Sequence, residues 1–167
     1  MPSPNNYYCD KCDFSGSSMS AWGSFIYQKG TIEVPINRVI GICYECDKIA
    51  PVEKLPSEQN LEKLKKASKR RPNSYVPQKL IKDEEKRLDL LESRKSDARC
   101  LKCGNHNFDV IPNYNLERKE NNPVKTDHIH KNCGGYICIQ KTSANFFMGD
   151  KLPTRFYNIE GIKIDNK

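Results

Sequence analysis

Residues 9–12 read Cys-Asp-Lys-Cys, and the same C-x2-C spacing recurs at residues 43–46 and 100–103. A fourth pair begins with histidine, because residues 130–133 read His-Lys-Asn-Cys. Two ligands at this spacing can turn around one metal ion, and tetrahedral Zn²⁺ needs four ligands, so such pairs combine in twos. The four pairs therefore predict two metal sites in a chain of 167 residues.

Order along the chain predicts which pairs combine. Thirty residues separate the first pair from the second, and 26 separate the third from the fourth. Both separations suit a β-hairpin between two metal-binding loops. We expect the first site to be formed by Cys9, Cys12, Cys43 and Cys46, and the second by Cys100, Cys103, His130 and Cys133.

The histidine ligand of the second site has competitors. His128 lies two residues before His130, and Cys138 lies five residues after the last pair, so either could replace His130. Residues 136–140 are typical of a strand, in which Cys138 is expected to be a small buried side chain. His106 is interpreted as a surface residue or as one that contacts a ligand.

Zinc is the metal that these residues favour, and two structural Zn²⁺ ions are the expected cofactors. Iron in a four-cysteine cage, disulfides and free thiols are the other interpretations. A thioredoxin-like redox pair would need a βαβ context, which none of the three C-x2-C pairs has. Residues 1–6 carry no signal-peptide pattern, so we expect a reducing, cytoplasmic environment in which paired cysteines bind metal.

Glycine follows the second ligand of two pairs, at Gly104 and at Gly134-Gly135, where a positive φ is often needed. Together with the paired cysteines, these residues resemble the zinc-ribbon (rubredoxin-like) fold group over residues 7–52 and 98–141. The resemblance implies two metal-binding loops on short antiparallel strands around each ion. It extends to no full-length family, and it implies a metal and a local fold but no activity.

Composition divides the chain into three parts. We expect an N-terminal zinc-ribbon module with a four-cysteine site at residues 1–55, and a charged helical linker or hairpin at residues 56–98. A C-terminal zinc-ribbon module with extra strands should occupy residues 99–167. The predicted fold class is α+β, with two small antiparallel-β modules joined by a helical hairpin.

Two helices are expected in the middle part, because leucines recur there at helical spacing. The first should begin at Ser57, which can cap it, and end near Arg71, before Pro72. The second should run from about Pro77 to Ser96. Arg94, near its end, would complement the helix dipole.

The N-terminal module should contain three strands. Residues 22–27 and 31–36 are rich in aromatic and β-branched residues and are separated by a short turn. Residues 38–43 should form a third strand. Phe14, Trp22 and Phe25 are expected to pack around the metal.

Strands are also expected in the C-terminal module, at residues 108–111 and 136–141. Residues 113–127 lack periodicity and predict a loop. Apolar residues at 146–148 and 156–164 indicate that the tail is ordered. We expect it to add a hairpin across this module.

The charge of the chain is modest. Twenty-eight Lys and Arg oppose 21 Asp and Glu, for a formal net charge of +7. Thiolate ligands would reduce this value to about +4, because they are deprotonated when they bind metal. One basic cluster could dock phosphates or be a solvated helix face; its members are Lys63, Lys65, Lys66, Lys69, Arg70 and Arg71.

Only 37% of the residues are hydrophobic, and no run approaches the ~18 apolar residues of a membrane span. No catalytic motif is present, and both metal sites can be closed with four ligands. The sequence thus predicts a non-enzymatic zinc-binding protein with no evident small-molecule substrate. Our first hypothesis is a protein–protein interaction module, such as a small accessory or immunity-type protein. The alternative is a nucleic-acid-binding zinc ribbon that uses the basic helix 63–71.

Overall fold

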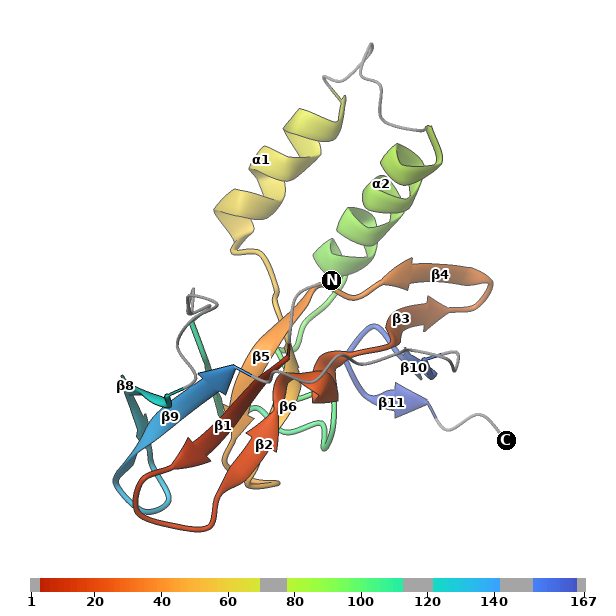
Figure 1. The fold of residues 1–167 in the computed structure, drawn as a ribbon. Coiled ribbons are helices and arrows are strands. Elements are labelled where there is room, and N and C mark those ends of the chain that lie inside the picture. The colour runs from red at the N-terminus through yellow and green to blue at the C-terminus, as the bar shows by residue number, and fades with distance from the viewer. Residues whose placement is uncertain (1–3, 70–77, 113–121, 142–151, 165–167) are drawn as a thin grey trace.

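The computed structural model describes residues 4–69, 78–112, 122–141 and 152–164. These residues form short strands, one 3-10 turn and two helices (Figure 1). In chain order the elements are β1 (Asn5–Cys9), β2 (Ser15–Ser17), η1 (Ser18–Ala21), β3 (Ser24–Lys29), β4 (Ile32–Pro35), β5 (Arg38–Cys43), β6 (Lys48–Glu53), α1 (Glu58–Lys69), α2 (Gln78–Glu92), β7 (Phe108–Val110), β8 (Val124–His130), β9 (Gly135–Lys141), β10 (Thr154–Tyr157) and β11 (Lys163–Ile164).

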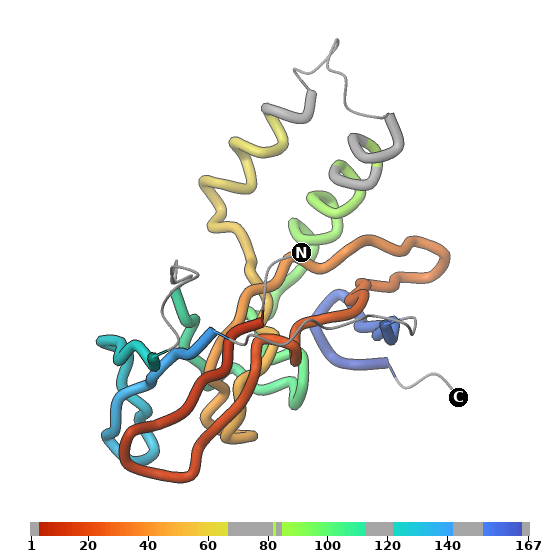
Figure 2. Tube along the Cα trace, in the orientation of Figure 1, coloured from red at the N-terminus to blue at the C-terminus, as the bar shows by residue number. Residues whose placement is uncertain are grey.

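The strands form three sheets, and each combines strands from residues 1–55 with strands from residues 99–167. Sheet A has the order β2-β1-β9-β8, sheet B the order β11-β10-β3-β4, and sheet C the order β6-β5-β7. The tube in Figure 2 shows the N-terminal strand β1 lying beside β9. The α+β class is as predicted, but the strands do not pair within residues 1–55 or 99–167 alone. Where domain boundaries fall stays a prediction.

Two larger apolar cores and a smaller one, which includes Ala50 and Val52, hold the sheets together. Sheets A and C pack on one another through a core that includes Tyr7 and Ile42. Sheet B packs against α2, so that Tyr27 and Tyr157 share a second core with Leu90. Alternate residues of β1 and β3 point into these cores, as expected for strands with one buried face.

The N-terminal hairpin forms as predicted. Strands β3 and β4 pair antiparallel and turn at Gly30, whose φ of 60° suits glycine. Strand β5 has the predicted bounds. Strand β6, which contains Pro51, is not among the strands predicted from the sequence. Proline is tolerated there because β6 lies at the edge of sheet C.

The helical hairpin projects from the sheets, with α1 and α2 side by side (Figure 1). Ser57 caps α1 as predicted, since its hydroxyl accepts the N–H of Asn60 at 3.4 Å. The predicted end of this helix near Arg71 lies outside the described residues. Lys65 ties the helices together through ion pairs with Asp89 and Glu92 of α2.

The expected role of Arg94 at a helix end is wrong. Helix α2 ends at Glu92, and Arg94 turns back into the protein to pair with Glu53 of β6. Its two terminal nitrogens donate to the Glu53 carboxylate at 2.7 and 2.6 Å. Tyr27 Oη and the Arg99 N–H also donate to Glu53, at 2.5 and 2.8 Å. A carboxylate that is 2% exposed needs such donors, because burying an unpaired charge is costly.

Two expectations for the C-terminal part need correction. The predicted loop at 113–127 overlaps strand β8, which pairs with β9 from Val124 onward through an irregular register. The tail does form a hairpin, β10–β11, but β10 pairs in parallel with β3 of the N-terminal part instead of crossing its own module. Residues 146–148 lie outside the described part of the chain.

Candidate metal centres

The first cluster consists of Cys9, Cys12, His130 and Cys133. Their ligand atoms all lie within 4.8 Å of one another. Cys9 Sγ is 3.3 Å from Cys133 Sγ, and His130 Nδ1 is 3.4 Å from Cys12 Sγ and 3.3 Å from Cys133 Sγ. Four ligands about 2.3 Å from a central ion would be separated by about 3.8 Å, so this cluster has the size of a tetrahedral metal site.

The second cluster consists of Cys43, Cys46, Cys100 and Cys103, again with all ligand atoms within 4.8 Å. The sulfurs of Cys43 and Cys103 are 3.4 Å apart, too far for a disulfide bond. Every cysteine in the two clusters is a free thiol. Both clusters have a donor set and a size that fit a metal ion.

The clusters contain all eight residues named from the sequence, but the pairs combine differently from the predicted order. Antiparallel pairing of β1 with β9 brings the loop after Cys9 to the loop after His130. Strand β5 pairs with β7, and Val52 bridges to Cys100, which joins the second loop to the third. The predicted pairing in chain order is wrong, because these long-range strand contacts decide which loops meet.

Each metal-binding pair has a buried first member. Cys9, Cys43, Cys100 and His130 are at most 7% exposed. Backbone N–H groups turn toward the sulfurs: Lys11 donates to Cys9 Sγ and Gly135 donates to Cys133 Sγ. Gly135 is needed for packing, because a Cβ at that position would overlap the sulfur of Cys9.

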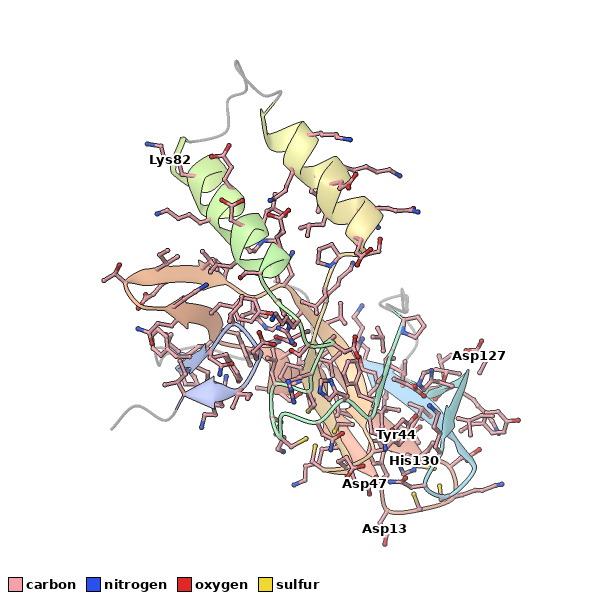
Figure 3. The ribbon with its side chains drawn as sticks, turned by 180° about the vertical axis from the view of Figure 1, so that it is seen from behind. Asp13, Tyr44, Asp47, Lys82, Asp127 and His130 are labelled. Atoms are coloured by element: carbon pink, nitrogen blue, oxygen red, sulfur yellow. The ribbon has the colours of Figure 1, made fainter. Side chains whose placement is uncertain are left out.

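His130 is oriented by a carboxylate from the other cluster's loop. Its Nδ1 faces the sulfurs, so Nε2 carries the proton and donates to Asp47 Oδ1 at 3.0 Å. The imidazole is 1% exposed and lies between Phe14, at 4.4 Å between ring centroids, and Tyr44, at 6.2 Å. Figure 3 shows Tyr44, Asp47 and His130 gathered at one end of the protein, next to the sulfurs.

The pKa values of the thiols are shifted by burial and by the neighbouring groups within each cluster. Burial raises the pKa of Cys9, but hydrogen bonds from the Lys11 N–H and the Cys133 thiol outweigh it and hold the pKa at about 7. Burial and the neighbouring Cys43 raise the pKa of Cys46 to about 12. A bound cation would offset this repulsion, so metal binding should release protons.

The alternative ligands do not join either cluster. Cys138 is a buried side chain in β9, as predicted, and His128 lies in β8 outside both groups. His106 is on the surface, and its Nδ1 lies 2.9 Å from the Ala98 carbonyl oxygen. Phe14 packs beside the first cluster as expected. Phe25 belongs instead to the core of sheet B.

The predicted basic cluster is only partly available for a ligand. Lys65 is engaged by α2, and Lys66 lies 3.9 Å from Glu62. Lys63 is exposed on α1. The side chain of Lys69, and all of Arg70 and Arg71, lie outside what the structure describes.

Lys63 also lines a groove that the sequence did not indicate. This cavity of about 710 Å³ lies between the start of β5, the segment after β6, and the helices. We call it the cationic groove, because Arg38, Lys54, Lys63 and Arg87 line it and no carboxylate does among the described residues. These cations come from four separate elements or loops, so no sequence run reveals them.

Asp47 and Tyr44 are the functional residues that the sequence analysis missed. Asp47 follows Cys46 as Gly104 follows Cys103 and Gly134 follows Cys133. Asp13 follows Cys12 in the same way, so this position alone does not single out Asp47.

Comparisons with known protein families, curated proteins and solved structures find no match for this chain. Within the described residues, no helix is both long and apolar enough to cross a membrane. The function must therefore be inferred from the two clusters and the surface around them.

Proposed function

We propose that this is a non-enzymatic protein that binds two structural Zn²⁺ ions and acts by binding nucleic acid through the cationic groove. Structural zinc sites are closed by four protein ligands, whereas catalytic ones keep a position for water. Each cluster offers four soft donors, and three or four of these are sulfurs, which supports zinc. Zinc also suits a chain with so small an apolar fraction.

The cationic groove is the observation that carries the nucleic-acid proposal. Lys54 and Lys63 are exposed at this groove and Arg38 is half-buried in it, so three cations can face a ligand there, whereas Arg87 is 6% exposed. Phosphate backbones bind such surfaces through electrostatic attraction and counterion release. Polar side chains of Asn37 and Asn60 line the same groove and could donate hydrogen bonds to phosphate oxygens.

Arg38 is held in place in a way that leaves its charge available. Its Nε donates to the Ala21 carbonyl at 3.0 Å, and one terminal nitrogen donates to the Gly23 carbonyl at 2.8 Å. Carbonyl oxygens orient the guanidinium without neutralising it. Burial lowers the pKa of Arg38, and the nearby Arg155 lowers it further.

The test is a titration of the zinc-loaded protein into labelled single- and double-stranded oligonucleotides at 50, 100 and 200 mM salt, followed by fluorescence anisotropy. With three phosphate contacts, we expect the slope of log affinity against log salt to be about −3 on double strands and about −2 on single strands. The double variant Lys54→Glu/Lys63→Glu should bind at least tenfold more weakly, with a shallower slope.

Lys29→Glu/Lys82→Glu is the matched control. It changes the net charge equally at exposed lysines that do not line the groove. Lys82 lies toward the far end of α2 (Figure 3). No binding at low salt, or equal loss in both double variants, would remove the groove as a nucleic-acid site.

Protein binding is the second candidate, favoured by one exposed apolar pair. Ile129 and Tyr136 face each other across β8 and β9 and are 49% and 37% exposed. The first cluster stabilises the sheet that carries them. If a partner protein docks there, Ile129→Asp should abolish its capture, whereas Ile162→Asp, on an equally exposed turn residue, should not.

A further inference from the structure

Asp47 has an unusual backbone for its residue type. Among the described residues, it is the one non-glycine position with a positive φ, at 45°. Gly104 and Gly134 occupy the corresponding place after their own cysteines, with φ of 77° and 69°. This region costs most L-residues about 1–2 kcal/mol, and although aspartate adopts it more readily than most, the contacts of its side chain show what it contributes here.

The contact of the Asp47 side chain crosses from one cluster to the other. Asp47 directly follows Cys46 of the second cluster, yet its Oδ1 accepts the Nε2–H of His130 in the first cluster at 3.0 Å. Asn132, between the ligands His130 and Cys133, donates to the same oxygen at 2.8 Å. The loop of the second cluster therefore supplies the acceptor that orients the only imidazole of the first.

A second residue of this loop packs against the same imidazole. The ring of Tyr44 stacks on His130, and its hydroxyl donates to Asp109 Oδ2 at 2.8 Å. Tyr44 and Asp47 belong to the loop of the second cluster, since Tyr44 follows Cys43 and Asp47 follows Cys46. The position of both side chains depends on how that loop is held.

We propose that Asp47 is a positioning residue that couples the two metal centres, so that filling the second cluster raises the metal affinity of the first. This inference rests on the proposed zinc sites. A metal ion on Cys43 and Cys46 would fix the loop and thereby place the Asp47 carboxylate at His130. Contacts of this kind with a ligating histidine typically change metal affinity by about 10–100-fold. Because coupling is reciprocal, an ion in the first cluster should equally favour the second.

A double-mutant cycle tests this directly. Asp47→Gly removes the carboxylate but keeps the positive φ, and Cys46→Ser disables the second cluster. Zinc affinity of the first cluster is measured by competition with a coloured chelator. Cobalt(II) absorption identifies the filled cluster, because sites with three sulfurs and one nitrogen differ in spectrum from four-sulfur sites.

In the wild-type background, Cys46→Ser should lower first-cluster affinity by about tenfold or more. In the Asp47→Gly background, the same change should have no further effect. Asp47→Asn, which keeps an acceptor oxygen, should fall between wild type and Asp47→Gly. Glu45→Gln is the control, since it removes an acid from the same loop whose side chain instead contacts Asn107.

The outcomes separate the coupling from the proposed function. If the wild-type protein binds two metals but Cys46→Ser weakens the first cluster equally in both backgrounds, the coupling through Asp47 is wrong. The same holds if Asp47→Gly leaves first-cluster affinity unchanged. If the wild-type protein binds no metal at either cluster, the proposed function itself fails, and the coupling fails with it.

Discussion

The sulfur atoms of Cys9 and Cys133 lie 3.3 Å apart, although the two residues are 124 positions apart in the chain. Strand pairing between β1 and β9 brings them together, so the first cluster joins the N-terminal strand to a strand that lies far along the chain. Closing so long a loop is costly in entropy, and the binding of an ion at the loop ends offsets that cost. The metals should therefore stabilise the tertiary fold as well as the local loops.

Gly135→Ala should empty the first cluster alone. The added methyl group would overlap the Cys9 sulfur and crowd Asp10 Oδ1 at 2.9 Å. Native mass spectrometry should show one zinc ion per chain where the wild type has two.

Gly134→Ala is its neighbouring control. Nothing lies within 4 Å of a Cβ there, so this change adds only the strain of a positive φ, about 1–2 kcal/mol. It should keep both ions. Two ions in the Gly135→Ala protein would contradict the described packing of the first cluster.

The sequence was sufficient to name the eight candidate ligands, since C-x2-C spacing is a local property of the chain. It could not pair them, because the partner of Cys9 is decided by which strand lies beside β1. The same limit applies to Arg94. Its sequence neighbours predict a helix, and they do not indicate its long-range contact with Glu53. The sequence does not predict the cationic groove, because Arg38 and Arg87 come to line the same cavity only after folding.

Arg94→Met should destabilise the protein severely. The change leaves the Glu53 carboxylate buried without its charged partner, which typically costs about 3–5 kcal/mol. Chemical denaturation of the zinc-loaded protein measures the loss. Lys65→Met breaks ion pairs whose acidic partners are 74% and 63% exposed, so it should cost at most about 1 kcal/mol. Similar losses in the two variants would argue against a special role for Arg94.

Stability should decline in alkali through Tyr157. The side chain is 1% exposed, its hydroxyl donates to the Leu101 carbonyl at 2.7 Å, and burial raises its pKa to about 12. An unfolded tyrosine ionises near pH 10, so between pH 10 and 12 unfolding releases a proton from this residue. Its contribution to stability is complete below pH 10 and is lost as the pH rises toward 12.

Tyr157→Phe should therefore flatten the pH dependence of the unfolding free energy by about one proton in that window. The measurement is chemical denaturation at a series of pH values from 9 to 12. Tyr136→Phe, at an exposed ring, is the control. An unchanged slope in the Tyr157→Phe protein would mean that this tyrosine ionises freely in the fold.

Removal of both metals should abolish cooperative folding. The described cores are small, and the second cluster forms part of a core with Ala50 and Val52. A strong chelator under reducing conditions should eliminate the thermal transition seen by circular dichroism. The same chelator saturated with zinc should have no effect. An unaltered transition after elemental analysis confirms complete demetallation would show that the apolar cores suffice.

X-ray absorption of zinc in the Cys12→Ser protein tests the interleaved clusters most directly. This variant should bind one zinc ion, held by the second cluster, with sulfur neighbours alone at about 2.3 Å. Pairing in chain order would instead leave the histidine-containing site intact. A nitrogen neighbour at about 2.0–2.1 Å in this variant would therefore contradict the account.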